Sequence, residues 1–160
     1  MSNKYSISDI EAFAARFYKD DMGNPIPLLI TPYGYTATFL ALAQAISATQ
    51  QLNIAANADF MCLGINVRAQ IGAAQTISTV TAPYIRLLVT DSGSNEQFTA
   101  QAVDALNWGG NPTLEKQLDY PRIIAGRSSL TVQVTNYAPT AETYTSIDVF
   151  FNGVLIRAFR

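Results

Sequence analysis

The sequence predicts a mainly β fold, an antiparallel jelly-roll-like sandwich or barrel of about seven or eight strands, preceded by one amphipathic helix. Three observations support this. Short segments alternate apolar and polar residues, clusters of Gly, Asn, Asp and Pro separate them, and no helical periodicity lies between them. The length of 160 residues fits one domain with a short extension. We expect an N-terminal helix and extended arm over residues 1–35 and a β-sandwich domain over residues 36–160.

The N-terminal helix is predicted over Ser6–Lys19, because apolar residues recur there at helical spacing and form one stripe. Two N-cap pairs fit its start equally well, Ser8 with Glu11 and Ser6 with Asp9. The stripe consists of Ile7, Ile10, Phe13, Ala14 and Phe17. It must dock somewhere, either over the open end of its own sheet or on a neighbouring subunit.

The segment after the helix is expected to be an extended connection, because residues 25–35 carry three prolines and a glycine. Thr36–Ala45 is ambiguous. Its alanines favour a helix, whereas its β-branched start and its alternation permit a strand. The strand is favoured because β segments follow.

The remaining chain is expected to form strands at residues 51–54, 60–70, 84–91, 96–106, 130–135, 147–151 and 154–159. Within the second of these, Leu63, Ile65 and Val67 are predicted to share one face. We expect a turn at residues 91–95 and a loop at residues 107–112. Asn152-Gly153 is the pair that a type I′ turn needs, so a hairpin is predicted between the last two strands.

Charged residues make up only 14% of the chain, and none occurs in Met22–Ala58 or in Ala69–Pro83. Thr, Gln, Ser and Asn fill the polar positions of these stretches instead. Such a surface costs little to desolvate and suits permanent protein–protein contact. The alternative is that part of this uncharged sequence faces a second layer of the same domain.

The residues give little support for catalysis. The chain has no histidine, so a Ser-His-Asp or Cys-His mechanism is impossible. Cys62 lies in an apolar run and is expected to be a small core residue. A carboxylate pair drawn from acids such as Asp59, Asp91 and Asp148 is the remaining enzymatic option and ranks last. For Asp59 the expected role is a turn before Phe60.

We therefore predict a non-enzymatic protein that needs no metal or cofactor. The segment Asp91–Glu96 lacks the ligand spacing of a calcium loop and is better explained as a hairpin turn. The net charge of −2 and the scattered basic residues argue against direct nucleic-acid binding. No run is long and apolar enough for a membrane span, and the start does not resemble a signal peptide, so we expect synthesis in the cytoplasm.

Aromatic and arginine residues supply the candidate interface. Trp108 and Tyr120 flank a Gly/Asn/Pro loop, where an exposed ring can stack on sugar or, alternatively, pin the loop to the sandwich. Arg157 and Arg160 are either partners for a neighbour or solvated chain-end residues. The candidate interface residues are Ile7, Ile10, Phe13, Phe17, Tyr33, Tyr35, Trp108, Tyr120, Arg157 and Arg160.

The order of the strand signals resembles a known class of proteins. It runs from residues 53–60 through Leu87–Asp91, a Gly/Asn/Pro loop and Tyr120–Ile124 to Leu130–Asn136 and finally Phe150–Gly153. This pattern, over Phe39–Ile156, resembles the β-sandwich auxiliary capsid proteins of tailed bacteriophages, called decoration, cement or minor capsid proteins. The N-terminal helix is a departure that such proteins need not have.

The resemblance implies a virion structural protein. It would bind the outer surface of the major capsid protein lattice and stabilise contacts between capsomers, as a homo-oligomer and most often a trimer. Its location would be the capsid surface after synthesis in the host cytoplasm. The alternative is a binding module that recognises a host glycan or receptor at a fibre or tail, with Asn107, Trp108, Asn111 and Tyr120 as candidates.

Overall fold

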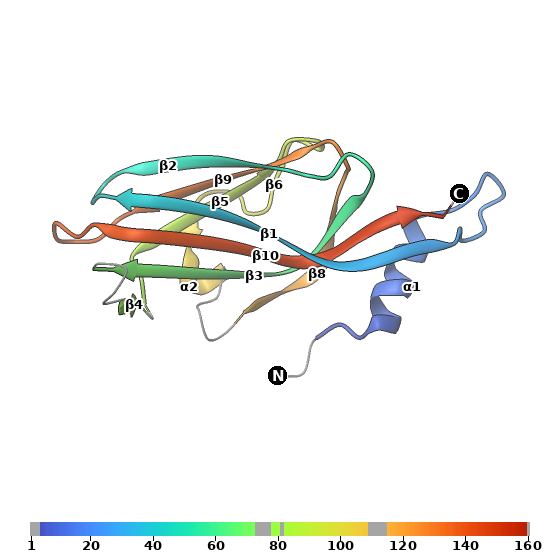
Figure 1. Cartoon of the computed structure of the whole chain (residues 1–160), viewed down its shortest axis with the longest axis horizontal. Coiled ribbons are helices and arrows are strands. Elements are labelled where there is room, and N and C mark those ends of the chain that lie inside the picture. Colours follow the sequence, from blue (N-terminus) through green and yellow to red (C-terminus); the bar gives the residue numbers. More distant parts are fainter. Residues whose placement is uncertain (1–3, 73–77, 81, 109–114, 160) are drawn as a thin grey trace.

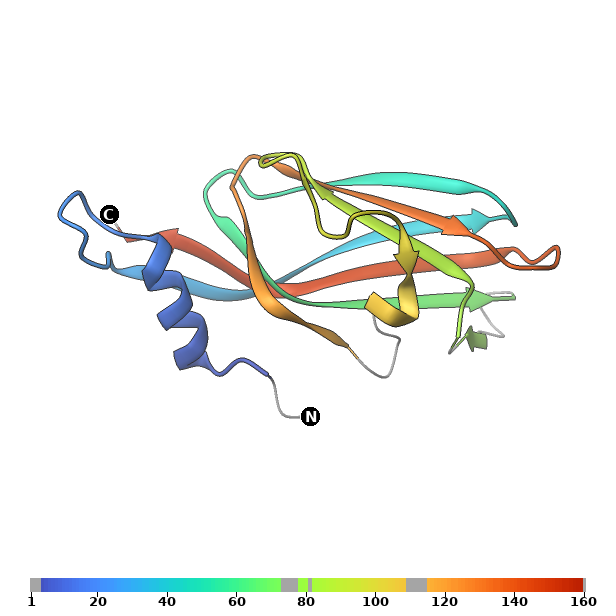
Figure 2. The ribbon, with the colours of Figure 1, turned by 180° about the vertical axis from the view of Figure 1, so that it is seen from behind.

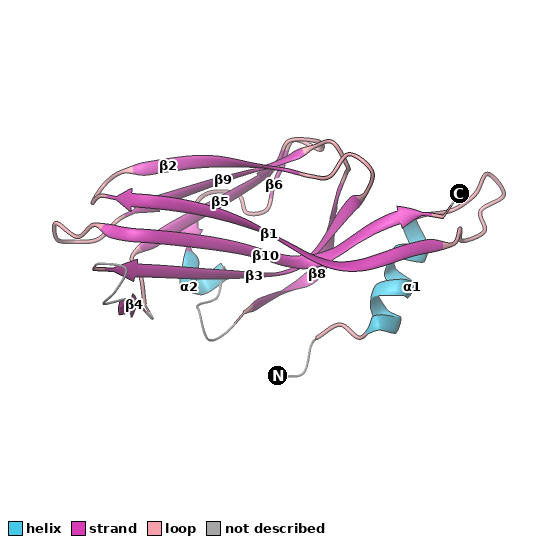
Figure 3. Cartoon of the chain, viewed as in Figure 1, coloured by secondary structure: helices cyan, strands magenta, loops and turns pink. Residues whose placement is uncertain are grey.

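The computed structural model describes residues 4–72, 78–80, 82–108 and 115–159, which form two antiparallel sheets with a helix near the N-terminus (Figures 1 and 3). The prediction of a mainly β antiparallel sandwich with an N-terminal helix is confirmed. The elements are α1 (Ile7–Phe17), β1 (Leu28–Leu42), β2 (Ser47–Asn53), β3 (Asp59–Ile71), β4 (Ser78–Val80), β5 (Ile85–Asp91), β6 (Glu96–Gln97), β7 (Val103–Asp104), α2 (Ala105–Trp108), β8 (Lys116–Ile124), β9 (Ser129–Asn136) and β10 (Tyr144–Ala158).

The strand order is that of a jelly roll. The first sheet runs β1-β10-β3, with β4 and β8 both paired to β3, and the second runs β2-β9-β5, with β6 and β7 both paired to β5. The longer strands alternate between the sheets along the chain, so β1, β3, β8 and β10 lie in one sheet and β2, β5 and β9 in the other. This alternation builds the two facing layers of a double-sheet jelly roll.

The main core lies between the two sheets. Alternate residues of β9, Leu130, Val132 and Val134, are fully buried, and Phe60 and Phe151 face them from the first sheet. The buried polar residue Asn136 is fully satisfied. Its Nδ2 donates to the carbonyl oxygens of Leu42 at 3.1 Å and Glu142 at 2.8 Å, and its Oδ1 accepts from the Ala138 amide at 3.0 Å. Asn136 thus ties the β1 end to the β9–β10 connection.

A second, smaller core lies under α1. The strands β1 and β10 run past the sandwich as a two-stranded extension, and α1 lies beside it in both views (Figures 1 and 2). Ala14 of the helix is fully buried in a cluster with Met61, Val154 and Ile156. In this single chain the helix therefore docks on its own sheet.

The helix is slightly shorter than predicted, and Ser6 is its N-cap. The Ser6 hydroxyl accepts from the Asp9 amide at 3.1 Å, and the Asp9 carboxylate accepts from the Ser6 amide at 2.9 Å. The Ser6 hydroxyl also donates to the Asp9 carboxylate at 2.7 Å, and this bond, together with the one from the Ser6 amide, lowers the pKa of Asp9. Of the two candidate pairs, Ser6 with Asp9 forms the capping box. The helix ends at Phe17 because Tyr18 is extended and Lys19 bridges to Pro25.

The predicted hairpin at Asn152-Gly153 is wrong. The strand β10 runs without a break from Tyr144 to Ala158, and neither residue has the positive φ that a type I′ turn needs. Gly153 instead allows a close approach, because a Cβ there would lie 2.0 Å from the carbonyl oxygen of Met61. The glycine therefore marks a tight strand contact, not a turn.

A β-bulge at the same place changes the predicted face of β3. The register between β10 and β3 shifts at Asn152/Gly153, so Leu63 is an extra residue on β3. Ile65 and Val67 point into the main core as predicted, whereas Leu63 packs against the cluster under α1. Before the bulge the even-numbered residues Phe60 and Cys62 face the main core, and after it the odd-numbered Ile65 and Val67 do.

Two predicted segments also differ from the observed structure. Residues 28–35 belong to β1 and are not a connection, so the expected division at residue 35 falls inside a continuous strand. The strand expected at residues 96–106 is wrong. Only Glu96–Gln97 and Val103–Asp104 pair, because Thr99 turns the chain by donating to the carbonyl of Gln101 at 2.7 Å.

The loop expected at residues 107–112 is also different, because Asn107 and Trp108 are in α2, and residues 109–112 lie outside the described residues. The strand β8 was not predicted, because Pro121 and the charges of Lys116, Asp119 and Arg122 hide its apolar positions.

Candidate functional site

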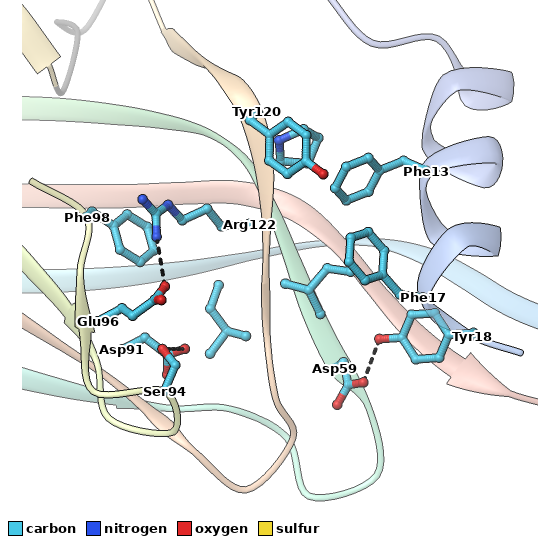
Figure 4. A pocket seen from close by; sticks show the side chains of 13 residues that line it. Phe13, Phe17, Tyr18, Asp59, Asp91, Ser94, Glu96, Phe98, Tyr120 and Arg122 are labelled. Atoms are coloured by element: carbon cyan, nitrogen blue, oxygen red, sulfur yellow. Dashed lines mark hydrogen bonds and ion pairs between the residues drawn. The ribbon is translucent and has the colours of Figure 1, made fainter.

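The candidate site is a groove of about 540 Å³ between α1, β8 and the turn that joins β5 to β6 (Figure 4). Its volume lies within the usual range for ligand pockets. The walls come from distant parts of the sequence. The helix and its end contribute Phe13, Phe17 and Tyr18, and the start of β3 contributes Asp59. The strand β8 contributes Tyr120–Ile124, and the β5–β6 hairpin with the residue after it contributes Asp91, Ser94, Glu96 and Phe98.

One wall of the groove is aromatic. The ring of Phe13 stands edge-on to the ring of Tyr120 with centroids 4.9 Å apart, and it lies 5.0 Å from the ring of Phe17. Phe17 is 55% exposed and Tyr120 is 60% exposed. Both outer rings therefore keep much of their apolar surface in water, while Phe13 anchors them to the core under α1.

The opposite wall carries an ion pair on an aromatic support. A guanidinium nitrogen of Arg122 lies 3.5 Å from a carboxylate oxygen of Glu96, and the guanidinium stands 4.7 Å from the centroid of the Phe98 ring. Phe98 is almost fully buried and contacts the Trp108 ring at 5.9 Å. This stacking fixes the orientation of Arg122 beside the groove (Figure 4).

The turn below this ion pair is held by Asp91. One of its carboxylate oxygens accepts from the Gly93 amide at 2.9 Å, and the other accepts from the Ser94 hydroxyl at 2.8 Å. These bonds confirm the predicted turn over residues 91–95. They also occupy both oxygens, so the role of Asp91 is to shape the turn.

The end of the groove is closed by Tyr18 and Asp59. The Tyr18 hydroxyl donates to Asp59 at 2.5 Å, and the other oxygen of Asp59 accepts from the Gly126 amide at 2.7 Å. Burial, together with this hydrogen bond, raises the pKa of Tyr18, so the phenol stays protonated at neutral pH. Asp59 does not make the expected local turn. It joins the end of α1 to β3 and to the β8–β9 connection.

The structure brings together three of the predicted interface residues, Phe13, Phe17 and Tyr120. Ile10 packs under the helix, whereas Ile7 is exposed outside the groove. Trp108 is half-buried against Phe98 and the main core, as expected for a ring that pins its own segment. Of the other glycan candidates, Asn107 is exposed and Asn111 lies outside the described residues.

The remaining predicted interface residues lie elsewhere. Tyr33 is exposed on β1 and contacts the ring of Tyr35, whose hydroxyl accepts from the Ala55 amide at 3.1 Å. Arg157 is half-buried, and its Nε is shielded from solvent without a hydrogen-bond partner within the described part of the chain. Arg160 lies outside the described residues.

Sequence reasoning did not find Glu96, Phe98 and Arg122 as site residues. Glu96 and Arg122 are far apart in sequence and belong to different sheets, so no spacing rule connects them. A partial signal existed in Arg122, which directly follows Pro121 between apolar residues of a strand.

The groove offers binding surfaces more than reactive groups. Among the residues that the structure describes, no three Cys, Asp or Glu side chains gather as a metal site. Burial raises the pKa of the Cys62 thiol to about 12, so it stays protonated at neutral pH, and its place in the core is confirmed.

Asp148, on the first sheet, accepts from the Thr38 hydroxyl at 2.7 Å. No helix in the described ranges is long and apolar enough to cross a membrane.

Comparisons with protein-family models, with curated proteins and with solved structures find no match to this chain. The interpretation of function therefore depends on the fold and on the groove.

Proposed function

We propose that this chain is a non-enzymatic structural protein of a virus particle, which binds the outer surface of a capsid lattice and stabilises contacts between neighbouring subunits. The fold is compatible with this role, because double-sheet jelly rolls include viral capsid domains. They also include lectins and cupins, so the site must decide among the uses of the fold.

The observation that carries the proposal is the pair of exposed rings, Phe17 and Tyr120, both of which contact the Phe13 ring of the packed helix. Aromatic side chains on a rigid frame bury a large apolar area with little loss of side-chain entropy. Such residues commonly carry most of the binding energy at protein interfaces. We infer that the groove receives an apolar segment of the neighbouring capsid subunit.

The outer face of the second sheet supports the same role. In β2 and β9, Thr49 pairs with Gln133 and Gln51 pairs with Thr131, opposite to the buried side chains of β9. These polar groups carry no charge, so covering them in a lattice costs less than covering ionised groups. Repetition of modest contacts by the symmetry of a shell adds avidity.

The test is co-sedimentation of the purified chain with cognate capsid shells assembled without it. We expect saturable binding in a fixed ratio to the major capsid protein. The double variant Phe17→Ser/Tyr120→Ser should weaken binding at least about tenfold, the loss expected when interface hot spots are truncated. Leu40→Ser is the matched control, because Leu40 is also an exposed apolar residue, 74% exposed, but lies on β1 outside the groove. Absence of co-sedimentation with the shells would contradict the proposal.

A second candidate is recognition of a host glycan or receptor through the same groove. It is favoured by the exposed Tyr120 ring beside the Arg122–Glu96 pair, since sugars stack on aromatic rings and bond to planar charged groups. A glycan array separates the two candidates. Binding to glycans that Tyr120→Ser abolishes, without binding to shells, would favour this second function.

A further inference from the structure

The strand β2 has one edge that no other strand pairs with in the described part of the chain. The strand β1 ends the first sheet and β2 ends the second, and among the residues that the structure describes β2 pairs with β9 alone (Figure 1). Its residues are largely exposed, and it contains no charge, proline or glycine. Its pairing with β9 has no register shift, so the strand is regular along its seven residues.

The hydrogen bonds at both ends of β2 show which backbone groups face outward. The Asn136 amide donates to the Ile46 carbonyl at 3.0 Å, and the Ile54 amide donates to the Ser128 carbonyl at 2.9 Å. Even-numbered residues therefore direct their N–H and C=O groups toward β9. Because these directions alternate along a strand, Ser47, Thr49, Gln51 and Asn53 direct theirs toward the free edge.

The neighbouring edge of β1 is protected in ways that β2 is not. Pro32 has no N–H to offer, and the Nε2 of Gln50 donates to the Thr38 carbonyl on β1. Proteins usually protect an edge strand with proline, charges or bulges, because an open edge recruits another strand. The sequence applies such protection to β1 and leaves β2 regular and uncharged.

We propose that β2 pairs antiparallel with β2 of a second copy of this chain, which joins the two second sheets into one continuous sheet. The occupant is a second copy because an antiparallel pair of identical strands is two-fold symmetric, so the same edge satisfies both partners. The register that pairs the whole strand places Thr49 opposite Gln51 and Ser47 opposite Asn53. These are neutral hydrogen-bonding side chains, so no like charges face each other.

This contact is independent of the groove, whose walls do not include β2. A two-fold contact gives a dimer, whereas the auxiliary capsid proteins that the sequence resembles are most often trimers. The oligomeric state and its dependence on β2 therefore test the proposal separately from shell or glycan binding.

The experiment is analytical ultracentrifugation of the full chain over a range of concentrations, with two double variants. Thr49→Lys/Gln51→Lys places lysines opposite each other across the proposed pair, which should prevent it. Thr131→Lys/Gln133→Lys adds the same charges to the same sheet face on the interior strand β9, and so is the matched control. We expect the parent and the control to dimerise and the β2 variant to remain a folded monomer, with circular dichroism confirming the fold of each.

Hydrogen exchange gives a second readout. In the parent, exchange of the Thr49 and Gln51 amides should slow as concentration rises, and it should not slow in the β2 variant. A parent that stays monomeric up to about 1 mM, where binding would be worth no more than about 4.1 kcal/mol, would overturn the proposal. A dimer or trimer that the β2 lysines leave intact would overturn it as well.

Discussion

At the scale of single residues, Asp59 illustrates how a residue with an ordinary local signal acquires a long-range role. It accepts hydrogen bonds from Tyr18 and from the Gly126 amide, and so links three segments around the end of the groove. The Tyr18 side of this link depends on a protonated phenol, because an ionised Tyr18 would repel the carboxylate. The link therefore has a defined pH dependence.

The variant Tyr18→Phe tests this dependence. Below pH 10 the parent should be more stable than the variant by about 1 kcal/mol, the usual net contribution of one hydrogen bond. The folded-state pKa of Tyr18 is raised above its ordinary value of 10.0, so this advantage is fully present below that pH and is lost as pH rises through the folded pKa. Urea unfolding of both proteins between about pH 8 and about pH 11 measures the difference.

Other tyrosines with raised pKa values, such as Tyr137 and Tyr144, affect both proteins equally, so only the difference in the free energy of unfolding is informative. A difference that stays constant across this range would contradict the role assigned to the Tyr18 phenol.

The burial of single residues could be predicted from the sequence where the local composition alone determines it. Phe60 and Cys62 lie in an apolar run and are fully buried. It failed where partners are far away in the chain. Arg122 meets Glu96 and Phe98 only because β8 of one sheet passes beside the β5–β6 turn of the other, and no local pattern encodes that meeting.

At the scale of elements, the contact between β3 and β10 is set by a bulge and two glycines. Leu63 is the extra residue on β3, Gly153 lies against the Met61 carbonyl, and Gly64 faces the side chain of Glu115. The two glycines differ in what an added methyl group would meet. At Gly153 the obstacle is backbone, whereas at Gly64 it is the flexible end of a side chain.

The variants Gly153→Ala and Gly64→Ala should therefore differ in stability. Gly153→Ala forces two paired strands apart and should cost about 3 kcal/mol, at the upper end of the range for overpacking. Gly64→Ala requires only that Glu115 move, which removes its hydrogen bond from the side-chain Nδ2 of Asn152 and should cost about 1 kcal/mol. Thermal unfolding of both variants checks this order, and equal losses would show that the close approach is not decisive.

The same bulge explains a failure of the sequence prediction. Asn152-Gly153 is a strong hairpin signal because both residues tolerate positive φ, yet here the glycine is required by a neighbouring strand. The helix was easier to predict, since its cap and its apolar stripe are local. Only the outer members of the stripe, Ile7 and Phe17, remain exposed.

At the scale of the whole molecule, the fold has two cores that share the strands β3 and β10. The main core fills the space between the sheets, and the smaller one lies between α1 and the outer face of the first sheet. Alternation and turn signals predicted the layered β fold, but they do not specify which strands pair, because most contacts join residues distant in sequence. The jelly-roll order is therefore known only from the structure.

The variant Ala14→Asp tests whether the two cores separate. It places a carboxylate at a fully buried position under the helix, where an unpaired charge is unfavourable. We expect α1 to detach and limited proteolysis to remove the segment before β1, while the sandwich keeps its near-ultraviolet signal. Ala12→Asp, at an exposed position of the same helix, is the control. Loss of the whole fold in Ala14→Asp would mean that the two cores unfold together.

The position of α1 also determines when it can fold during translation. Val154 and Ile156, which complete the docking surface of Ala14, are translated about 140 residues after it. At about 5–20 residues per second, the synthesis of these residues takes about 7 to 28 seconds, and the apolar stripe lacks this part of its docking surface for that time. The strand β10, which lies between β1 and β3, is the last strand of the first sheet to be synthesised. The strands β1 and β3 therefore have no pairing partner between them until then. The nascent chain must keep these apolar surfaces apart until β10 emerges.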